Sequence, residues 1–180
     1  MIAKHISRKR KNDDYGRLAQ YIADAPEKGE KCLVSWSAGC WSGDDDYGTG
    51  IVEAKNTQGM NTRSAKEKTY HLIVSFRPED EAKLTSEAFK AIEERFAQAL
   101  GFAEHQRHCG VHKNTNNLHL HIAYNMIHPD RHSRHEPFRD YKTLSDTCRR
   151  LEQEYGLVVD NGMEKARADR LSEKAAAIEA

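Results

Sequence analysis

The sequence predicts an α+β fold in which an antiparallel β-sheet has helices packed on one face and leaves the other face open for a ligand. Residues 107–112 and 118–125 alternate polar and apolar side chains with the period of two that is typical of strands. The polar turn between them predicts an antiparallel hairpin. Residues 14–24, 86–100 and 140–155 instead place apolar side chains at helical spacing.

The length of 180 residues is enough for one domain with a hydrophobic core, which we expect to occupy residues 1–160. The stretch 161–180 is rich in Ala, Glu, Lys and Arg, and we expect a helical or disordered extension there. It would lead to a C-terminal region beyond Ala180. The chain contains no apolar run of membrane-spanning length and no signal-peptide apolar region, so we expect a cytoplasmic protein without membrane insertion.

The N-terminal part of the chain predicts a strand and a helix joined by a basic loop. The strand covers residues 1–6 and the loop covers residues 8–12. A helix then begins after a cap at Asp13 or Asp14 and runs to about Asp24. The apolar stripe of this helix consists of Tyr15, Leu18, Ile22 and Ala25.

The rest of the chain predicts elements that alternate between strand and helix. Residues 31–37 and 70–76 have strand character, and a Gly- and Asp-rich loop at 40–50 precedes a short helix at 51–57. Two longer helices follow a loop at 78–84: one runs from a cap at Thr85 or Ser86 to Gly101, and one covers 140–155 and ends at Gly156.

The hairpin brings three histidines to one surface. His119 and His121 share a face of the second strand, and His112 lies on the corresponding face of the first, because directly opposed residues of an antiparallel pair point to the same side. If His112 opposes His119, then Gly110 opposes His121 and leaves open space beside that ring. A tighter turn would place His112 diagonal to His119. Either register gathers three imidazoles.

Three neutral imidazoles form a metal site with an open coordination position. An isolated His-X-His pair is more often a surface pair than a ligand pair, and the third histidine from the hairpin is what favours a metal. We expect His112, His119 and His121 to hold a divalent ion, Mg²⁺ or Mn²⁺, with Zn²⁺ as the alternative. The ion would act as a Lewis acid for a substrate oxygen, because no acidic or thiolate ligand fills the shell.

Charge is unevenly distributed along the chain, although the formal net charge of zero argues against a uniformly basic nucleic-acid binder. The first basic run comprises Arg8, Lys9, Arg10 and Lys11. A second basic zone follows the histidines, between Arg131 and Arg150. A charge run is usually a solvated face, but two such runs flanking a metal candidate indicate a path for phosphates.

The four cysteines lack C-x-x-C spacing and are interpreted as free thiols.

Two further polar residues each allow two interpretations. Tyr21 lies at the border of the helix stripe, about 60° from Leu18. Such a tyrosine is most often a packing residue with its hydroxyl in water, and it could equally be a nucleophile held at the rim of a site. Ser75 lies on the polar face of the strand 70–76. Alone it is an ordinary strand-end serine, but it would join the histidine surface if the strands are neighbours.

The sequence resembles the P-type (MOB-P) conjugative relaxases of the HUH endonuclease superfamily, and most closely those of IncP plasmids. The resemblance runs from Met1 to about Asn161 and rests on several stretches taken together. These are residues 1–5 (MIAKH), 18–22 (LAQYI), 61–76, 104–107 (EHQR), 112–125, 135–139 (HEPFR) and 154–157.

The resemblance implies a metal-dependent enzyme that nicks and rejoins one DNA strand at an origin of transfer through a covalent 5′-phosphotyrosine intermediate. The first motif of the family places the nucleophile at Tyr21, not at Tyr15. Its second motif places a DNA-contacting serine at Ser75. Its third motif supplies the metal ligands His112, His119 and His121, with His119 also acting as proton acceptor.

The resemblance also implies partners. These are single-stranded DNA at the origin of transfer, accessory DNA-binding proteins of the relaxosome, and the coupling protein of a type IV secretion system. The complex would leave the bacterial cytoplasm for a recipient cell. The turn departs from the family pattern, which usually has acidic residues where this chain has Asn114 and Asn116. We therefore expect Asn117, which matches, together with Glu104 or Glu136, to orient the histidines.

Two other functions stay open from the sequence. One is a related HUH enzyme, either a rolling-circle replication initiator or a transposase, against which the chain start and residues 135–139 argue. The other is a non-enzymatic module that binds the origin with a decayed site. The presence of Tyr21 and all three histidines argues against decay.

Overall fold

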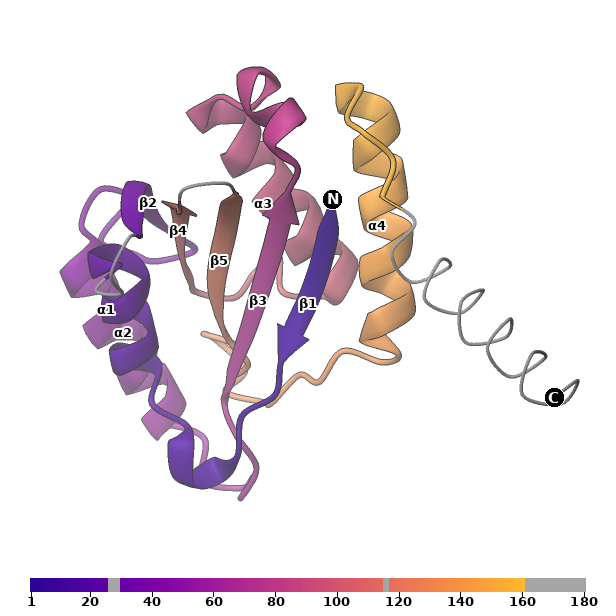
Figure 1. Cartoon of the computed structure of the whole chain (residues 1–180). Coiled ribbons are helices and arrows are strands. Elements are labelled where there is room, and N and C mark those ends of the chain that lie inside the picture. The colour runs from indigo at the N-terminus through magenta and orange to yellow at the C-terminus, as the bar shows by residue number, and fades with distance from the viewer. Residues whose placement is uncertain (26–29, 115–116, 161–180) are drawn as a thin grey trace, which may run out of the picture.

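The computed structural model describes residues 1–25, 30–114 and 117–160. Its centre is one five-stranded sheet in which every neighbouring pair of strands is antiparallel (Figure 1). The hairpin strands expected from the sequence are adjacent at its middle. Across the sheet, the strands lie in the order β1 (Ile2–Ile6), β3 (Thr69–Phe76), β5 (Leu118–Asn125), β4 (Arg107–Lys113) and β2 (Lys31–Ala38).

Capping side chains mark where the helices begin, and a glycine in the left-handed conformation marks where α3 ends. The side chain of Asp14 accepts a hydrogen bond from the Arg17 amide at the start of α1, and Thr85 does the same for the Ala88 amide at the start of α3. Gly101 closes α3 at a φ of 83°. The helices are α1 (Tyr15–Asp24), α2 (Tyr47–Gly59), α3 (Ser86–Leu100) and α4 (Asp140–Tyr155), with short 3-10 turns η1 (Arg10–Asn12) and η2 (Pro78–Lys83).

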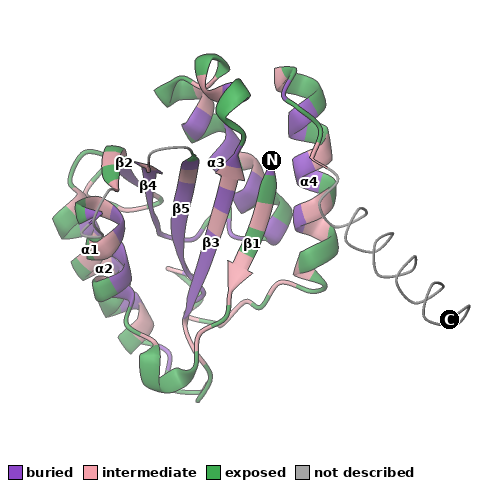
Figure 2. Cartoon of the chain, in the orientation of Figure 1, coloured by how far each residue is buried: buried purple, intermediate pink, exposed green. Residues whose placement is uncertain are grey.

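The main hydrophobic core lies on one face of the sheet, beneath α3 and α4. Strands β3, β4 and β5 are buried along most of their length (Figure 2). The alternation in β3 and β5 directs their apolar side chains into this core, as the sequence predicts. Its fully buried members from these strands and from α3 include Leu72, Val74, Leu120, Ile122, Ile92 and Phe96.

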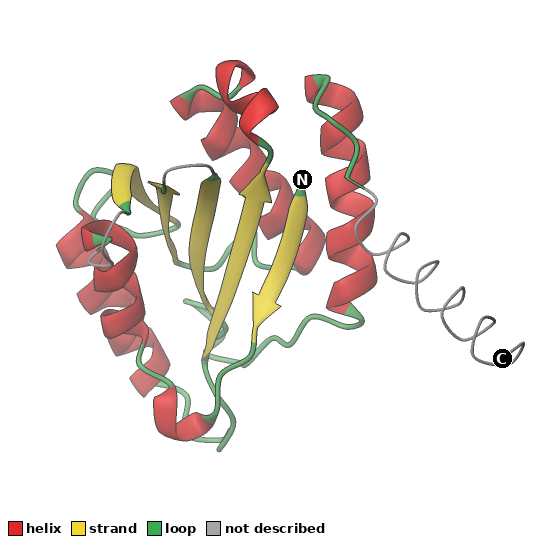
Figure 3. Ribbon diagram, in the orientation of Figure 1, coloured by secondary structure: helices red, strands yellow, loops and turns green. Residues whose placement is uncertain are grey.

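Helices α1 and α2 cover part of the opposite face, so the expectation that helices pack on one face only is wrong (Figure 3). The physical reason is side-chain size. Gly110 and Ala123 leave a shallow strip on this otherwise polar face, and the apolar stripe of α1 packs into it. A Cβ on Gly110 would lie 2.7 Å from Ile22 Cγ2, so Ile22 fills the space that was expected to stay open beside His121.

Two smaller differences concern loops, and one expectation falls outside the described chain. Helix α2 begins at Tyr47, because the side chain of Asp46 caps it, so the loop before it is shorter than expected. The expected loop 78–84 is mostly a 3-10 turn. The extension expected at 161–180 lies outside the described residues.

No helix in the described part of the chain is long and apolar enough to cross a membrane.

A buried histidine holds α1 and α2 to the sheet. His108 Nε2 donates to the Tyr47 carbonyl at 3.1 Å, so its Nδ1 is free to accept from the Tyr15 hydroxyl at 2.6 Å. Burial lowers the pKa of His108 to about 4. His105 is a second example: its Nδ1 donates to the Asn125 carbonyl at 2.7 Å, and burial lowers its pKa to about 4. Both imidazoles are therefore neutral parts of the packing.

Acid should unfold this domain in a way that depends on its buried histidines. Their folded pKa values lie below the ordinary 6.5, so the unfolded chain binds protons first as the pH falls. The stabilisation is fully present above about pH 6.5 and is lost toward pH 4, by about 1.4 kcal/mol per pH unit for each histidine. Urea unfolding at pH 7, 6 and 5 measures this slope. A free energy of unfolding that stays flat from pH 7 to 5 contradicts the prediction.

The close packing of α1 on β4 is tested by Gly110→Ala. Because the added methyl group meets both Ile22 Cγ2 and the Ile22 carbonyl, we expect a loss of about 1–3 kcal/mol in the free energy of unfolding. Gly48→Ala is the matched control, since a Cβ there meets nothing within 4 Å and Gly48 lies in helix α2. The control should gain up to about 1 kcal/mol. Equal effects in denaturant melts refute the packing argument.

Candidate active site

The register of the hairpin sets the geometry of the site. His112 pairs with His119 and Gly110 pairs with His121, which confirms the first of the two expected registers. The ring centroids of His112 and His121 are 4.4 Å apart, and those of His119 and His121 are 6.4 Å apart. His112 is completely buried and His121 nearly so, whereas His119 is partly exposed. The three imidazoles therefore form one cluster.

Strand β3 adds two polar side chains to this cluster. Ser75 pairs with His119 across the sheet, and its hydroxyl lies 3.0 Å from His119 Nδ1. His71 Nε2 lies 3.2 Å from His121 Nδ1, within hydrogen-bond distance. Ser75 was expected on this surface, whereas the contact of His71 was missed. The alternation of β3 already put His71 and Ser75 on one face, which was the available signal.

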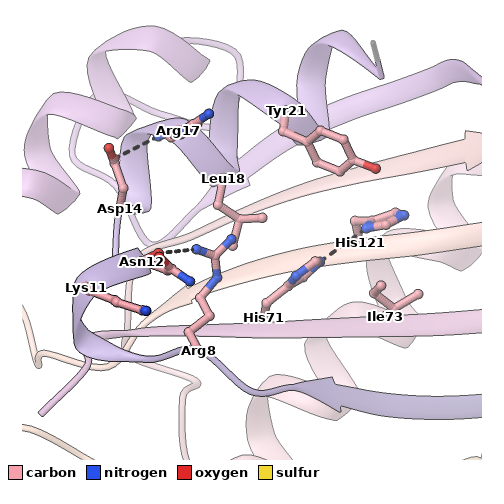
Figure 4. Close-up of a pocket in the computed structure, with 10 residues that line it drawn as sticks. All are labelled: Arg8, Lys11, Asn12, Asp14, Arg17, Leu18, Tyr21, His71, Ile73 and His121. Atoms are coloured by element: carbon pink, nitrogen blue, oxygen red, sulfur yellow. Dashed lines mark hydrogen bonds between the residues drawn. The ribbon is translucent and has the colours of Figure 1, made fainter. Parts of the chain in front are cut away.

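Helix α1 places Tyr21 beside the histidines. The Tyr21 ring centroid is 5.8 Å from that of His112 and 6.0 Å from that of His121. Tyr21 lines a pocket of about 530 Å³ together with His71 and His121 (Figure 4). Tyr15 faces away from this pocket: it is 1% exposed and its hydroxyl contacts His108. Of the two tyrosines in α1, Tyr21 is thus the one at the cluster.

His112 links the cluster to the helix that carries Tyr21. Its Nε2 donates to the carbonyl oxygen of Ile22 at 2.6 Å, so Nε2 carries a proton. Its Nδ1 lies 3.3 Å from Glu30 Oε2, and neither of these buried atoms has another hydrogen-bond partner. Glu30 is therefore the carboxylate that the structure places beside a histidine of the cluster, and no motif or spacing along the chain predicts this contact.

The cluster has the donor chemistry of a metal site, with its rings turned toward protein partners. Burial and the neighbouring imidazoles lower the pKa of His121 to about 3, and burial lowers that of His119. Neutral imidazoles are the form that binds metals. His112 Nδ1 is a buried nitrogen without a well-formed hydrogen bond. Among the described residues, however, no three His, Cys, Asp or Glu side chains converge closely enough to share an ion.

The residues expected to orient the histidines lie elsewhere. Glu104 contacts His128 at 2.7 Å, beyond the end of β4 that is opposite to His112. Glu136 contacts Arg134 at 3.2 Å. Neither carboxylate has a contact with the cluster in the described chain, so the structure does not support their expected role.

The hairpin turn contacts the cluster through a different asparagine from the one expected. The side-chain amide of Asn114 is 3.5 Å from His119 Nε2. The Asn117 amide N–H donates to Asn114 Oδ1 at 2.9 Å. Asn117 therefore acts on the position of Asn114, and Asn114 is the side chain that reaches His119.

The first basic run divides into two parts. Arg8 and Lys11 line the Tyr21 pocket, which also receives Arg17 from α1 (Figure 4). Arg8 Nη1 donates to the Asn12 carbonyl at 2.7 Å, which holds the guanidinium at the pocket wall. Lys9 and Arg10 are exposed and do not line the pocket. The pocket thus combines cations, an imidazole pair and a phenol.

Comparison with known proteins gives concordant results. A family model described as "Relaxase: MobA/VirD2-like, nuclease domain" matches residues 21–157. Two TraI proteins of Escherichia coli are 46% and 44% identical to this chain over 162 residues, which is 89% of the chain. The same alignments cover 22% and 21% of those proteins, so the chain spans about a fifth of their length.

A solved structure shows the same fold at low sequence identity. The MobM relaxase domain (MOBV; Mob_Pre), bound to a 26-nucleotide pMV158 oriT DNA, is 15% identical to this chain with a TM-score of 0.51. The superposition covers 89% of this chain and 90% of that one. Because the family model matches most of the chain, the resemblance drawn from the sequence is confirmed, and the chain belongs to the relaxase family, with a MobA/VirD2-like nuclease domain.

Proposed function

We propose that this domain nicks and rejoins single-stranded DNA at an origin of transfer, using Tyr21 as the nucleophile. The observation that carries the proposal is the position of Tyr21. Its ring lies within 6.0 Å of two imidazoles and faces a pocket lined by Arg8, Lys11 and Arg17. A phenol, neutral bases and cations around one cavity suit attack on a phosphodiester, whose negative charge otherwise repels nucleophiles.

The reaction follows from the residues present. The Tyr21 oxygen forms a bond to phosphorus while the bond from phosphorus to the 3′ oxygen breaks, and the leaving strand takes up a proton as its 3′ hydroxyl. Because a phenol has an ordinary pKa of about 10, the attack requires a proton acceptor. His119, partly exposed and neutral, is the proposed acceptor. The aryl phosphate keeps the bond energy, so the reverse attack rejoins the strand without ATP.

The three histidines are proposed to hold a divalent ion, Mg²⁺ or Mn²⁺, with Zn²⁺ as the alternative. When bound, such an ion supplies charge neutralisation and orientation at a nonbridging phosphate oxygen. His71 is a positioning residue in this proposal: through its 3.2 Å contact with His121 Nδ1 it holds that ring and leaves Nε2 for the ion. Ser75 contacts Nδ1 of His119, which is the ring nitrogen left to accept the proton when Nε2 faces the ion, in addition to its proposed contact with DNA.

The biological setting is part of the proposal. The substrate would be the single strand at an origin of transfer, consistent with the oriT DNA bound by the MobM domain. Accessory relaxosome proteins would expose that strand in the bacterial cytoplasm, and a type IV coupling protein would pass the covalent complex to a recipient cell.

Tyr21→Phe tests the nucleophile. The variant keeps the ring and removes only the attacking oxygen, so the domain should fold and bind a single-stranded origin oligonucleotide with about the parent affinity. Adduct formation should fall below detection. Denaturing gel electrophoresis after incubation with the oligonucleotide and Mg²⁺ or Mn²⁺ measures the covalent product.

Tyr15→Phe is the matched control, because it removes the other hydroxyl of α1. It leaves His108 Nδ1 without its partner and should cost about 1–3 kcal/mol of stability. Adduct should nevertheless form at the parent level below the melting temperature. Loss of adduct in Tyr15→Phe with retention in Tyr21→Phe would overturn the assignment.

Metal binding is tested separately from activity. Mn²⁺ or Zn²⁺ should raise the thermal melting temperature of the parent domain, and His121→Ala should remove most of that increase. Since His121 is buried, each variant is compared with its own metal-free melt. His132→Asn serves as the control because His132 lies outside the cluster, at a φ of 55° that asparagine tolerates. An equal metal-induced shift in all three proteins contradicts the ligand assignment.

A further inference from the structure

A second pocket, of about 640 Å³, lies between the loop that precedes β3 and the loop that follows β5. It is outside the histidine cluster, and the reaction described above does not use it. Its lining is dominated by cations and small hydroxyl side chains, which include Thr62, Arg63, Ser64, Lys66, Arg131 and Arg134.

The two loops that form this pocket are held together by partly buried hydrogen bonds. Arg134 is only 9% exposed in its side chain, and its guanidinium donates to the Glu67 carbonyl at 2.7 Å and to the Glu67 carboxylate at 2.8 Å. The Asn61 side-chain amide donates to the His132 carbonyl at 2.8 Å. Arg134 therefore has a structural role, and these hydrogen bonds define the shape of the pocket.

The other three cations are weakly engaged. Arg63 has no ion pair within the described part of the chain. Lys66 is 3.9 Å from Glu136, and Arg131 is 3.8 Å from Glu104, with all four side chains more than half exposed. Exposed pairs of this kind contribute about 0–1 kcal/mol, so an anion can replace the carboxylates at small cost.

The lining indicates which part of a nucleic acid would bind. Among the residues that the structure places around this pocket, none is Phe, Tyr or Trp, and the imidazole of His132 is the one aromatic ring among them. Guanidinium, ammonium and hydroxyl groups instead suit phosphate oxygens, which are contacted in the same way in every sequence. The expected ligand is therefore a phosphodiester backbone.

A hydrogen bond joins the two segments of chain that carry these pockets, next to residues that line them. The Lys68 amide donates to Asp13 Oδ2 at 2.7 Å, and both neighbours of Asp13, Asn12 and Asp14, line the Tyr21 pocket. In Figure 1, η1 and the loop before β3 lie together at the lower end of the molecule. A strand that leaves the Tyr21 pocket past Lys11 can continue along this end.

We propose that the second pocket binds backbone phosphates of the strand whose scissile phosphate lies at Tyr21, and so lengthens the DNA contact independently of sequence. This proposal rests on the proposed function. It assigns the loop cations a role in affinity, whereas the Tyr21 pocket holds the reacting phosphate.

The experiment measures single-stranded DNA binding by fluorescence anisotropy as a function of salt, in a Tyr21→Phe background that prevents cleavage. Arg63→Ala/Arg131→Ala should weaken binding to an oligonucleotide of about 30 nucleotides. It should also reduce the magnitude of the slope of log K against log salt by about 1.4, since each phosphate contact on a single strand contributes about 0.7. A scrambled oligonucleotide should show the same change in slope.

The control is Lys90→Ala/Arg95→Ala, which removes the same charge from α3 on the other face of the sheet and should leave the slope unchanged. Equal slopes for the pocket variant and the parent overturn the proposal, as does an equal reduction in the control. A change confined to the origin sequence also overturns it, because backbone binding is independent of sequence. If the domain with Tyr21 intact forms the covalent adduct while the pocket variant has the same slope as the Tyr21→Phe protein, only this proposal fails. If the domain with Tyr21 intact neither binds single-stranded DNA nor forms adduct, both fail.

Discussion

The hydrogen bond from His112 Nε2 to the Ile22 carbonyl, 2.6 Å long and fully buried, fixes helix α1 on the sheet. It works because Gly110, two residues before His112, has no side chain and lets Ile22 approach the strand closely. The residue before Ile22 is Tyr21, so the same contact sets the distance between the phenol ring and the imidazoles. The position of the proposed nucleophile is therefore a consequence of packing in the middle of the domain.

The histidines have two roles that compete. His108 and His112 satisfy buried carbonyl groups of the helix layer, whereas His119 and His121 leave ring nitrogens for other partners. Burial keeps the low-pKa imidazoles neutral, which suits both packing and metal binding. Glu30 lies against the buried Nδ1 of His112 and joins the site to the segment after α1. The local charge near this histidine thus depends on a carboxylate that is distant in sequence from the hairpin.

The sequence predicted the parts of the site that depend on short-range periodicity. Alternation in 118–125 and the polar turn were enough to gather the three histidines on one face, although they left two registers open, and helical spacing was enough to separate Tyr21 from the buried Tyr15. It did not predict which side of the sheet α1 covers, because the histidine face looked polar and the small residues Gly110 and Ala123 were not interpreted as a helix-packing surface. The contacts of His71 and Glu30 depend on tertiary proximity, which spacing along the chain does not reveal.

The most direct measurement is to identify the residue that carries DNA in the covalent product. Trypsin cleaves after Lys11, Arg17 and Lys28, so Tyr15 and Tyr21 fall in different peptides, residues 12–17 and 18–28. After nuclease trimming, mass spectrometry should find the nucleotide adduct on the peptide 18–28, with fragmentation placing it on Tyr21. An adduct on the peptide 12–17, or a cleaved oligonucleotide with no protein-linked product, would contradict the account.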